Sequence, residues 1–466
     1  MPPRDQSSNF SLPLLNHSSS DNSYPPTSSS TRFTSSPRSP SLLHILSRVS
    51  FPAVSLTVLA FIYFAFSPSS ISPAKESVDW SEWTHRNESN VDVFKGLEIK
   101  GKDGDSRAVF TALGASLNEF WVKDRNGKMR DIVIGYPDPR SAISQPSSYA
   151  YFGSIVGRYA NRISQSSFVS PYSNETFSLP INEGFNTTLH GGLWGYSRSG
   201  WKVQSHKEDE IIFSLLDEGT EGFPGTVQTT LTYTLSSSPT RFTTHMISRV
   251  LSPLPLRTPI LLSSHIYWNL GGWEREVDRG KGGGMKLWVD SERTVEVDEG
   301  LIPTGKLVRV EKNGPLDFGG GGSEGKERGL REVLEDSRVK DLCGAGCTGL
   351  DNALIYSNSS RTDTQQIVMS LSSPSSGIRL KARTNQPLLH LYSCNSPSFT
   401  EGAYPKKSSH GEGSYEQYSC LAVEQEGWID GLHHREEWGL TGEESQWYDE
   451  KREYEWWSEY EFETFD

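Results

Sequence analysis

The sequence predicts an all-β fold, a large antiparallel β-sandwich, from two patterns along the chain. In residues 227–235, apolar residues alternate with threonine and glutamine, which is the period of a strand with one buried face. Residues 113–122 and 131–136 both have strand character, and the Asn-Gly turn within 123–128 would join them as a β-hairpin. Helical periodicity is nearly absent, apart from a short charged stretch in 327–341. We therefore expect packed sheets connected by polar loops.

The chain has 466 residues, which exceeds one typical domain, so we expect one large domain with appendages. Its net charge of −13 and isoelectric point near 5.4 argue against a nucleic-acid partner. The 13 tryptophans and 18 tyrosines suit a groove in which flat rings stack on sugars. Aromatic residues are equally ordinary in strands and cores, so composition alone does not choose a function.

The N-terminal region predicts a tail and a membrane anchor. Residues 1–48 are rich in serine and proline and should form a disordered cytoplasmic tail. Residues 49–66 are about 18 mostly apolar residues without charge, close to the shortest helix that spans a bilayer. A linker at 67–90 would connect this transmembrane signal anchor to the folded domain at 91–466.

The charges that flank the apolar segment set its expected orientation. Basic residues precede it and mainly acidic residues follow it, namely Arg32, Arg38 and Arg48, then Glu76, Asp79 and Glu82. The positive-inside rule then gives a single-pass type II membrane protein of the secretory pathway, with the large domain lumenal or extracellular. A cleaved signal peptide and a serine-rich organelle transit peptide remain alternatives. Glycosylation sequons fit a lumenal domain, at Asn87, Asn174, Asn186 and Asn358.

The four cysteines indicate a disulfide rather than a metal centre. Cys343 and Cys347 flank Gly-Ala-Gly, and these glycines would let the chain bend enough for a short disulfide in an oxidising compartment. Their spacing supplies too few ligands for a metal, and no other Cys or His cluster completes a site. We therefore expect neither a metal nor a cofactor.

Several residues with chemical potential stand in the predicted sheet. His265 lies in an apolar run at 258–270, which we expect to be one strand with Tyr267 on the same face. His190 precedes two glycines that would let a ligand approach the backbone. Asn161 and Arg162 supply an amide and a guanidinium fork that suit sugar hydroxyls. Two carboxylates, Asp351 and Glu424, follow apolar stretches. Taken singly, each residue could equally be an ordinary core or surface residue.

Taken in order, these pieces resemble the aldose 1-epimerase (galactose mutarotase) family. The likeness runs from about Val93 nearly to the C-terminus, so it covers the whole predicted folded region. The matching stretches are 113–136, 152–163, 189–192, 221–225, 258–270, 298–305, 349–351 and 423–430. The resemblance implies a β-supersandwich that binds a small-molecule aldose.

The resemblance also implies the roles of individual residues. Glu424 matches the family's general base, which takes the proton of the C1 hydroxyl, and His265 matches the general acid at the ring oxygen. His190 matches a second histidine that stabilises developing charge. The sugar-binding positions that match are Asn161, Arg162 and Asp351. For this chemistry we expect His265 protonated and Glu424 ionised, since their proximity favours both charged forms.

The sequence departs from the family pattern at several positions. His390 stands where the family commonly has glutamine, although it can still bind a sugar hydroxyl, and Glu426 adds a charge beside the expected base. A glycan at Asn186 would crowd the mouth of the cleft. The acidic, aromatic C-terminus at 449–466 would form a last strand with a charged edge.

Other functions remain open from the sequence. Asp351 and Glu424 could be the two carboxylates of a glycosidase, because spacing along the chain does not fix their distance. A non-catalytic sugar-binding module or sensor could use the same residues. A phosphosugar epimerase would need a basic cluster for the phosphate, and none is evident around the motifs.

Overall fold

The computed structural model describes residues 87, 89–144, 149–319, 326–357, 365–442 and 445–466. Contacts along the chain separate two units, Met1–Ser69 and Ser70–Asp466, and every described residue belongs to the second. The predicted tail at 1–48, the predicted anchor at 49–66 and nearly all of the predicted linker at 67–90 lie outside the described residues. Where residues are described, no helix has the length and apolar character needed to cross a bilayer.

The largest sheet has nine antiparallel strands, and its middle strands each bury alternate side chains. The alternation predicted for 227–235 is confirmed by one of them, β12. In order across the sheet the strands are β10 (Lys202–His206), β11 (Glu210–Asp217), β12 (Val227–Ser236), β13 (Thr240–Val250), β27 (Tyr454–Thr464), β23 (Ile378–Thr384), β22 (Met369–Ser373), β17 (Lys286–Val289) and β20 (Arg328–Gly329).

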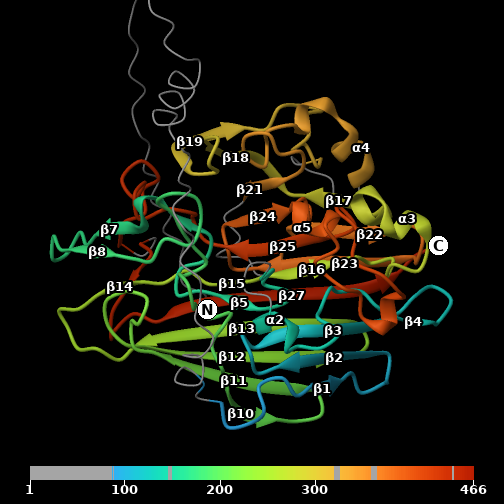
Figure 1. Cartoon of the computed structure of the whole chain (residues 1–466), viewed down its shortest axis with the longest axis horizontal. Coiled ribbons are helices and arrows are strands. Elements are labelled where there is room, and N and C mark those ends of the chain that lie inside the picture. Colours follow the sequence, from blue (N-terminus) through green and yellow to red (C-terminus); the bar gives the residue numbers. More distant parts are fainter. Residues whose placement is uncertain (1–86, 88, 145–148, 320–325, 358–364, 443–444) are drawn as a thin grey trace, which may run out of the picture. The chain divides into compact units, whose positions relative to one another are not determined.

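A second antiparallel sheet has six strands and carries several of the candidate site residues. In order these are β16 (Ile266–Trp268), β25 (Leu421–Glu426), β24 (Leu388–Tyr392), β21 (Asp351–Tyr356), β18 (Ser291–Val297) and β19 (Pro303–Arg309). They follow one another in this order in Figure 1. Neighbouring strands place side chains of opposite residues close together, so residues far apart in sequence meet on one face.

A four-stranded sheet contains the predicted hairpin. Its strands are β1 (Leu97–Lys100), β2 (Ser106–Thr111), β3 (Ser116–Lys123) and β4 (Met129–Asp131). The hairpin of β3 and β4 is confirmed, with Gly127 at φ +77° in its turn. The return strand is shorter than predicted and ends at Asp131, because the next residues bond the backbone of the β16 region instead.

Short ribbons and helices complete the described fold. The ribbons pair β5 (Ile155–Val156) with β15 (Ser263–Ser264), β6 (Arg162–Ile163) with β9 (Thr188–Leu189), β7 (Ser167–Val169) with β8 (Thr176–Ser178), and β14 (Thr258–Pro259) with β26 (Trp447–Tyr448). The helices are α2 (Ser141–Ser144), α3 (Glu276–Arg279), α4 (Leu330–Glu335) and α5 (Pro397–Thr400), with 3-10 turns η3 (Ser164–Ser166), η4 (Lys281–Gly284), η5 (Ser337–Val339) and η6 (Ser408–His410). Of the helix expected in 327–341, only the short helix α4 and the 3-10 turn η5 form.

Buried aromatic rings join the three large sheets. Phe120 of β3 lies 5.1 Å from the ring of Phe242 in β13 and 5.9 Å, edge on, from Trp268 in β16. Trp268 in turn lies 5.4 Å from Tyr460 in β27. Such pairs contribute about 0.5–1.5 kcal/mol each beyond their burial. The predicted large antiparallel all-β fold is therefore confirmed.

The C-terminal strand β27 is not an edge strand, so the predicted charged edge is wrong. It lies between β13 and β23 in the interior of the nine-stranded sheet. Its acidic side chains pair with basic ones on both neighbours; Glu461 lies 2.9 Å from Arg241 of β13 and 3.2 Å from Arg383 of β23. The charge pattern therefore reflects cross-strand pairing on a solvent-facing side, rather than protection of an edge.

Two disulfides are present. The predicted one, Cys343–Cys347, is confirmed, with Cα atoms 5.4 Å apart. The second joins Cys394 to Cys420 across a Cα distance of 5.7 Å, and the sequence did not indicate it. This bond ties the end of β24 to the beginning of β25 and closes the intervening loop. It therefore fixes the ends of two adjacent strands of the six-stranded sheet.

Candidate active site

His265 lies between β15 and β16, where the chain passes from one sheet to another. The single strand expected at 258–270 is broken into three pieces, because β14, β15 and β16 pair with three different partners, β26, β5 and β25. The backbone N–H of His265 donates to the carbonyl of Ser154 at 2.9 Å, and its carbonyl accepts from Gly153 at 3.0 Å. The histidine is thus held on both sides.

Two tyrosines hold the His265 ring. Tyr267 stacks on it with ring centroids 4.9 Å apart and an interplanar angle of 28°, as expected for residues on one face. Tyr151 stacks at 5.7 Å and 26°. The hydroxyl of Tyr267 is itself anchored on the carbonyl of Ala150 at 2.8 Å. The imidazole is therefore preorganised by packing.

Glu424 lies in β25 and faces His265. The pairing of Val423 with Ile266 sets the register between β25 and β16 and brings the two side chains together. The Nε2 atom of His265 is 3.4 Å from Oε1 of Glu424, and the two residues are only 5% and 2% exposed. An imidazole and a carboxyl group in contact can exchange one proton between them.

The charge state expected for this pair is wrong for the unliganded site. Burial lowers the pKa of His265 to about 3, and the charge of His390 contributes in the same direction. Burial also raises the pKa of Glu424 well above 4.5, and the carboxylates of Glu426 and Asp351 raise it further. Desolvation disfavours the charged form of each group. Burial therefore favours the neutral imidazole of His265 and the protonated carboxyl group of Glu424 in the unliganded site.

His190 offers a fixed hydrogen-bond donor beside this pair. Its Nδ1 accepts a hydrogen bond from the backbone N–H of Asn161 at 3.1 Å, so the ring proton is on Nε2. Burial lowers the pKa of His190 well below 6.5, which keeps the ring neutral. Its centroid lies 5.1 Å from that of His265. Gly191 follows at φ +85°, where a Cβ would collide with the carbonyl of Gly157.

The same tautomer argues against a metal at this place. The ligand atoms of His190, His265 and Glu424 lie within 4.8 Å of one another, and this set could in principle hold an ion. Coordination through Nε2 of His190 would move its proton to Nδ1, directly against the N–H of Asn161. The histidine therefore fits a hydrogen-bond donor rather than a ligand.

Arg162 and Asp351 form the polar side of the site. Arg162 binds Glu183 through two parallel hydrogen bonds of 2.8 and 2.9 Å and reaches Asp351 at 3.4 Å. The other oxygen of Asp351 lies 2.5 Å from Nε2 of His390. Burial alone would raise the pKa of Asp351, but Arg162 and His390 outweigh it and lower the pKa to about 2. Asp351 is thus a permanent acceptor for hydroxyls.

Asn161 is partly committed to protein partners. Its Nδ2 donates to Glu426 at 3.1 Å, and its Oδ1 accepts from the backbone N–H of Arg162 at 2.9 Å. Its backbone has φ +59°, a left-handed conformation that places it at the bend before β6. Asn161 therefore lines the site with one amide hydrogen still available to a ligand.

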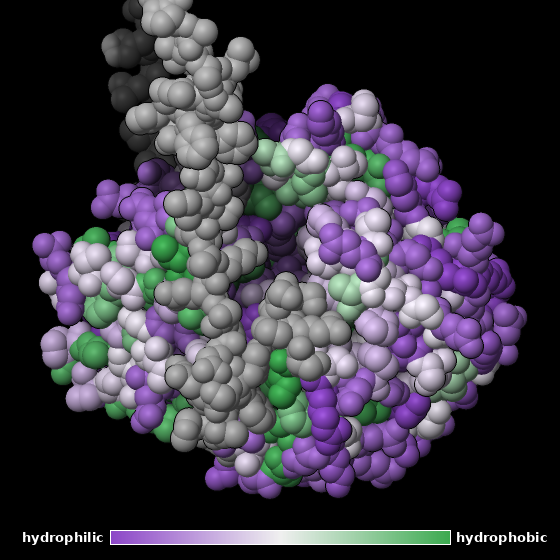
Figure 2. All heavy atoms as spheres, in the orientation of Figure 1, coloured by the Kyte–Doolittle hydropathy of each residue, from purple (hydrophilic) through white to green (hydrophobic). Residues whose placement is uncertain are grey.

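These residues line one pocket of about 260 Å³, near the lower end of the size range of small-molecule sites. Figure 2 shows a hollow in this face at the place where Figure 1 draws β21 and β24. All seven predicted site residues are in its wall. The lining residues are Tyr149, Ala150, Tyr151, Asn161, Arg162, Glu183, Leu189, His190, His265, Tyr267, Asp351, His390, Tyr392, Ser396, Phe399, Tyr404 and Glu424.

Sequence reasoning did not identify several of these residues. Tyr151 directly precedes the matching stretch 152–163, which is the only sequence signal near it. Glu183 lies in a loop without any local pattern, and only its contact with Arg162 marks it. Phe399 and Tyr404 come from the loop closed by the second disulfide. Such loop residues carry no periodic signal.

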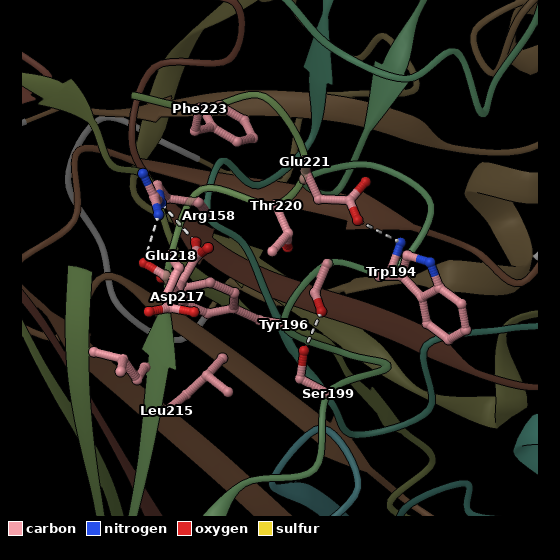
Figure 3. Close-up of a pocket in the computed structure, with 13 residues that line it drawn as sticks. Arg158, Trp194, Tyr196, Ser199, Leu215, Asp217, Glu218, Thr220, Glu221 and Phe223 are labelled. Atoms are coloured by element: carbon pink, nitrogen blue, oxygen red, sulfur yellow. Dashed lines mark hydrogen bonds and ion pairs between the residues drawn. The ribbon is translucent and has the colours of Figure 1, made fainter. Parts of the chain in front are cut away.

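A neighbouring pocket of about 300 Å³ borders the loop after His190 but has different chemistry. Three of its charged groups are committed to other protein groups, as Figure 3 shows: Arg158 pairs with Asp217 at 2.6 Å, and Glu221 accepts the backbone N–H of Trp194. Glu221 also accepts the N–H of Leu193 at 2.9 Å. Among the described residues that line this pocket there is no histidine. Through its two hydrogen bonds, Glu221 holds the loop that follows His190 of the candidate active site.

Comparison with known proteins agrees with the family resemblance seen in the sequence. The family model described as aldose 1-epimerase matches residues 98–447. A protein of Arthroderma benhamiae named "Probable aldose 1-epimerase" is 38% identical over 362 residues, which are 71% of this chain and 78% of that protein. The aldose 1-epimerase of Escherichia coli is 28% identical over 324 residues, covering 69% of this chain and 83% of the bacterial one.

Solved structures show the same fold. The crystal structure of an aldose epimerase homologue from C. elegans aligns with a TM-score of 0.64 and 23% sequence identity, and the alignment covers 80% of this chain and 99% of that one. The structure of a galactose 1-epimerase from Lactobacillus acidophilus aligns with a TM-score of 0.58 at 19% identity, over 80% of this chain and all of the other. At these identities the likeness is one of fold.

Proposed function

Because this chain belongs to the aldose 1-epimerase family and is a mutarotase, we propose that its pocket interconverts the α and β anomers of hexopyranoses such as glucose and galactose. The observation that carries the assignment of the site is the contact between His265 and Glu424, at 3.4 Å in the wall of a sugar-sized pocket. An acid and a base in contact are what opening and closing a hemiacetal ring requires.

In the proposed mechanism the sugar first draws the resting pair into its reactive form. Hydroxyls that donate to Glu424 stabilise its carboxylate, so its proton passes to His265 across their contact. Arg162 favours the same change, because its charge lowers the pKa of Glu424. The imidazolium and carboxylate then face the anomeric centre together.

Ring opening moves two protons and breaks one bond. Glu424 takes the proton of the C1 hydroxyl, the C1–O1 bond becomes a carbonyl, and the C1–O5 bond electrons pass to O5, which takes a proton from His265. The open-chain aldehyde turns about C1–C2. Closure reverses each transfer on the other face, so both residues return to their starting state. His190 donates from Nε2 to an oxygen that gains negative charge.

The polar side of the pocket binds the remaining hydroxyls. Asp351 and Arg162 present an acceptor and donors on fixed strands, and His390 holds Asp351 in place. Both oxygens of Asp351 already have protein partners, which disfavours its use as the second carboxylate of a glycosidase. A sensor would bind sugar without turnover and would not need the His265 contact.

Polarimetry of the purified full-length chain tests this assignment. Freshly dissolved α-D-glucose and α-D-galactose should reach their equilibrium rotation faster with the protein than without it. Release of a reducing end from a glycoside would support the hydrolase instead, and sugar binding without faster mutarotation would support the sensor. His265→Ala provides the inactive comparison. Glu327→Gln, at a carboxylate that pairs with Arg379 of the nine-stranded sheet and lies outside the pocket, provides the active one.

We further propose that residues 49–66 anchor the enzyme in a membrane of the secretory pathway, with the catalytic domain lumenal or extracellular. Two features support this location: both cysteine pairs are oxidised, and the sequons at Asn174 and Asn186 are exposed. Alkaline carbonate extraction should leave the chain with the membranes, and endoglycosidase should increase its mobility. A carbonate-soluble chain that endoglycosidase leaves unchanged would contradict this location.

A further inference from the structure

Strand β25 carries two buried acidic residues on one face. Glu424 and Glu426 are two positions apart, so their side chains point to the same side of the strand. Glu424 lines the pocket, whereas Glu426 is completely buried and does not. Glu426 is thus a carboxyl group behind the wall of the site, out of reach of a bound sugar.

The partners of Glu426 are few for so buried a group. Its Oε1 accepts from Nδ2 of Asn161 at 3.1 Å and lies 3.7 Å from Nδ1 of His390. Its Oε2 is buried without a hydrogen-bond partner, and so is Nδ1 of His390. Burying a carboxyl group in this way is costly, and such groups persist mainly where they have a functional use.

Through Asn161 this carboxyl group reaches the substrate-binding residues. The same amide that donates to Glu426 accepts from the N–H of Arg162, and the backbone N–H of Asn161 fixes the tautomer of His190. Through His390, Glu426 is linked to Asp351. Glu426 is therefore linked to Arg162 through Asn161 and to Asp351 through His390.

Charged groups from four strands surround Glu426. They are His390 of β24, Asp351 of β21, Arg162 of β6 and Glu424 of β25, with the phenol of Tyr159 also within its field. Burial raises the pKa of Glu426 to about 7, while His390 and Asn161 act in the opposite direction. After burial, the charge of Glu426 is the largest influence that raises the pKa of Glu424.

We propose that Glu426 is a positioning residue that orients Asn161 and His390 and, through its negative charge, keeps the shared proton on the His265–Glu424 pair to higher pH. This inference rests on the proposed mutarotase mechanism. His390 and Glu426 are two positions where the sequence departs from the family pattern, and they lie beside each other, with Nδ1 of His390 3.7 Å from Oε1 of Glu426.

The variant Glu426→Gln separates charge from shape. Its amide oxygen can still accept from Asn161, so orientation is kept while the negative charge is lost. The pair of His265 and Glu424 should then lose its proton at lower pH. We expect the alkaline limb of kcat/KM for α-D-galactose to move toward acid by about one pH unit, the size of effect that a nearby buried charge exerts. KM should stay within about twofold, because Glu426 does not touch the sugar.

Controls keep the result interpretable. Glu426→Asp retains the charge and should keep the alkaline limb near its wild-type position, and Glu327→Gln should change neither the limb nor kcat. If Glu426→Gln does not fold, Glu426→Met, which removes the negative charge at a similar side-chain volume, should show the same shift.

An alkaline limb that stays in place in a folded Glu426→Gln enzyme would overturn the inference, even if kcat falls, because a merely structural role lowers the rate without moving the limb. An inactive wild-type chain would instead refute the proposed function itself, so the two failures are distinguishable.

Discussion

Replacing Glu424 by glutamine should destroy activity while keeping the shape of the site. The amide still reaches Nε2 of His265 across the 3.4 Å contact but cannot take the proton of the C1 hydroxyl. Proton transfer by a positioned side chain contributes about 10²–10⁴-fold to a rate. We therefore expect kcat to fall by about that factor, or about 3–5 kcal/mol of activation free energy. KM should change little, since the sugar contacts remain.

The same substitution should increase stability at high pH. Burial raises the pKa of Glu424 in the folded chain above its usual 4.5. A carboxyl group whose pKa is raised on folding makes its full contribution to stability below its pKa in the unfolded chain. That contribution is lost as the pH rises through its pKa in the folded chain. Glutamine does not titrate and avoids the loss. The urea midpoint of Glu424→Gln should therefore exceed that of the wild type at pH 8, and the difference should shrink toward pH 4.

Polarimetry and urea unfolding monitored by tryptophan fluorescence measure the two effects on the same preparations. Glu327→Gln is the matched control, since it removes a largely buried carboxylate outside the pocket. A Glu424→Gln enzyme with the wild-type rate would refute the assignment of the base. A variant that is less stable than the wild type at pH 8 would refute the argument that desolvation dominates this carboxyl group.

Three further variants test other contacts. Glu183→Gln loosens Arg162, so we expect KM for galactose to rise about tenfold at nearly unchanged kcat, the cost of one charge-assisted hydrogen bond; unchanged KM would contradict this. Replacing Cys394 and Cys420 by alanine should cost about 3.5 kcal/mol in urea unfolding, as a 26-residue separation implies, and an unshifted midpoint would argue against a stabilising disulfide. Glu221→Gln weakens one of two backbone contacts and should lower stability by about 1–2 kcal/mol with some loss of kcat; wild-type values of both would show that the loop does not depend on it.

The sequence by itself determined the strand character and the identity of the reactive residues. Alternation within 227–235 is a local property, because one face of that strand is buried and the other is solvated. The resemblance to a family transferred His265 and Glu424 by position, and the structure brings them into contact. Local patterns also predicted the Cys343–Cys347 disulfide, since its partners are only four positions apart.

Only the tertiary structure decided which charges those residues carry. Two groups in contact suggest an ion pair when they are read from sequence, but burial on all sides gives His265 a lowered pKa and Glu424 a raised one. Burial depends on the packing of several sheets around the pair, and no local pattern encodes it. For the same reason, the contacts of Glu183 with Arg162 and of Glu426 with Asn161 were not predicted, because only folding brings these distant parts of the chain together.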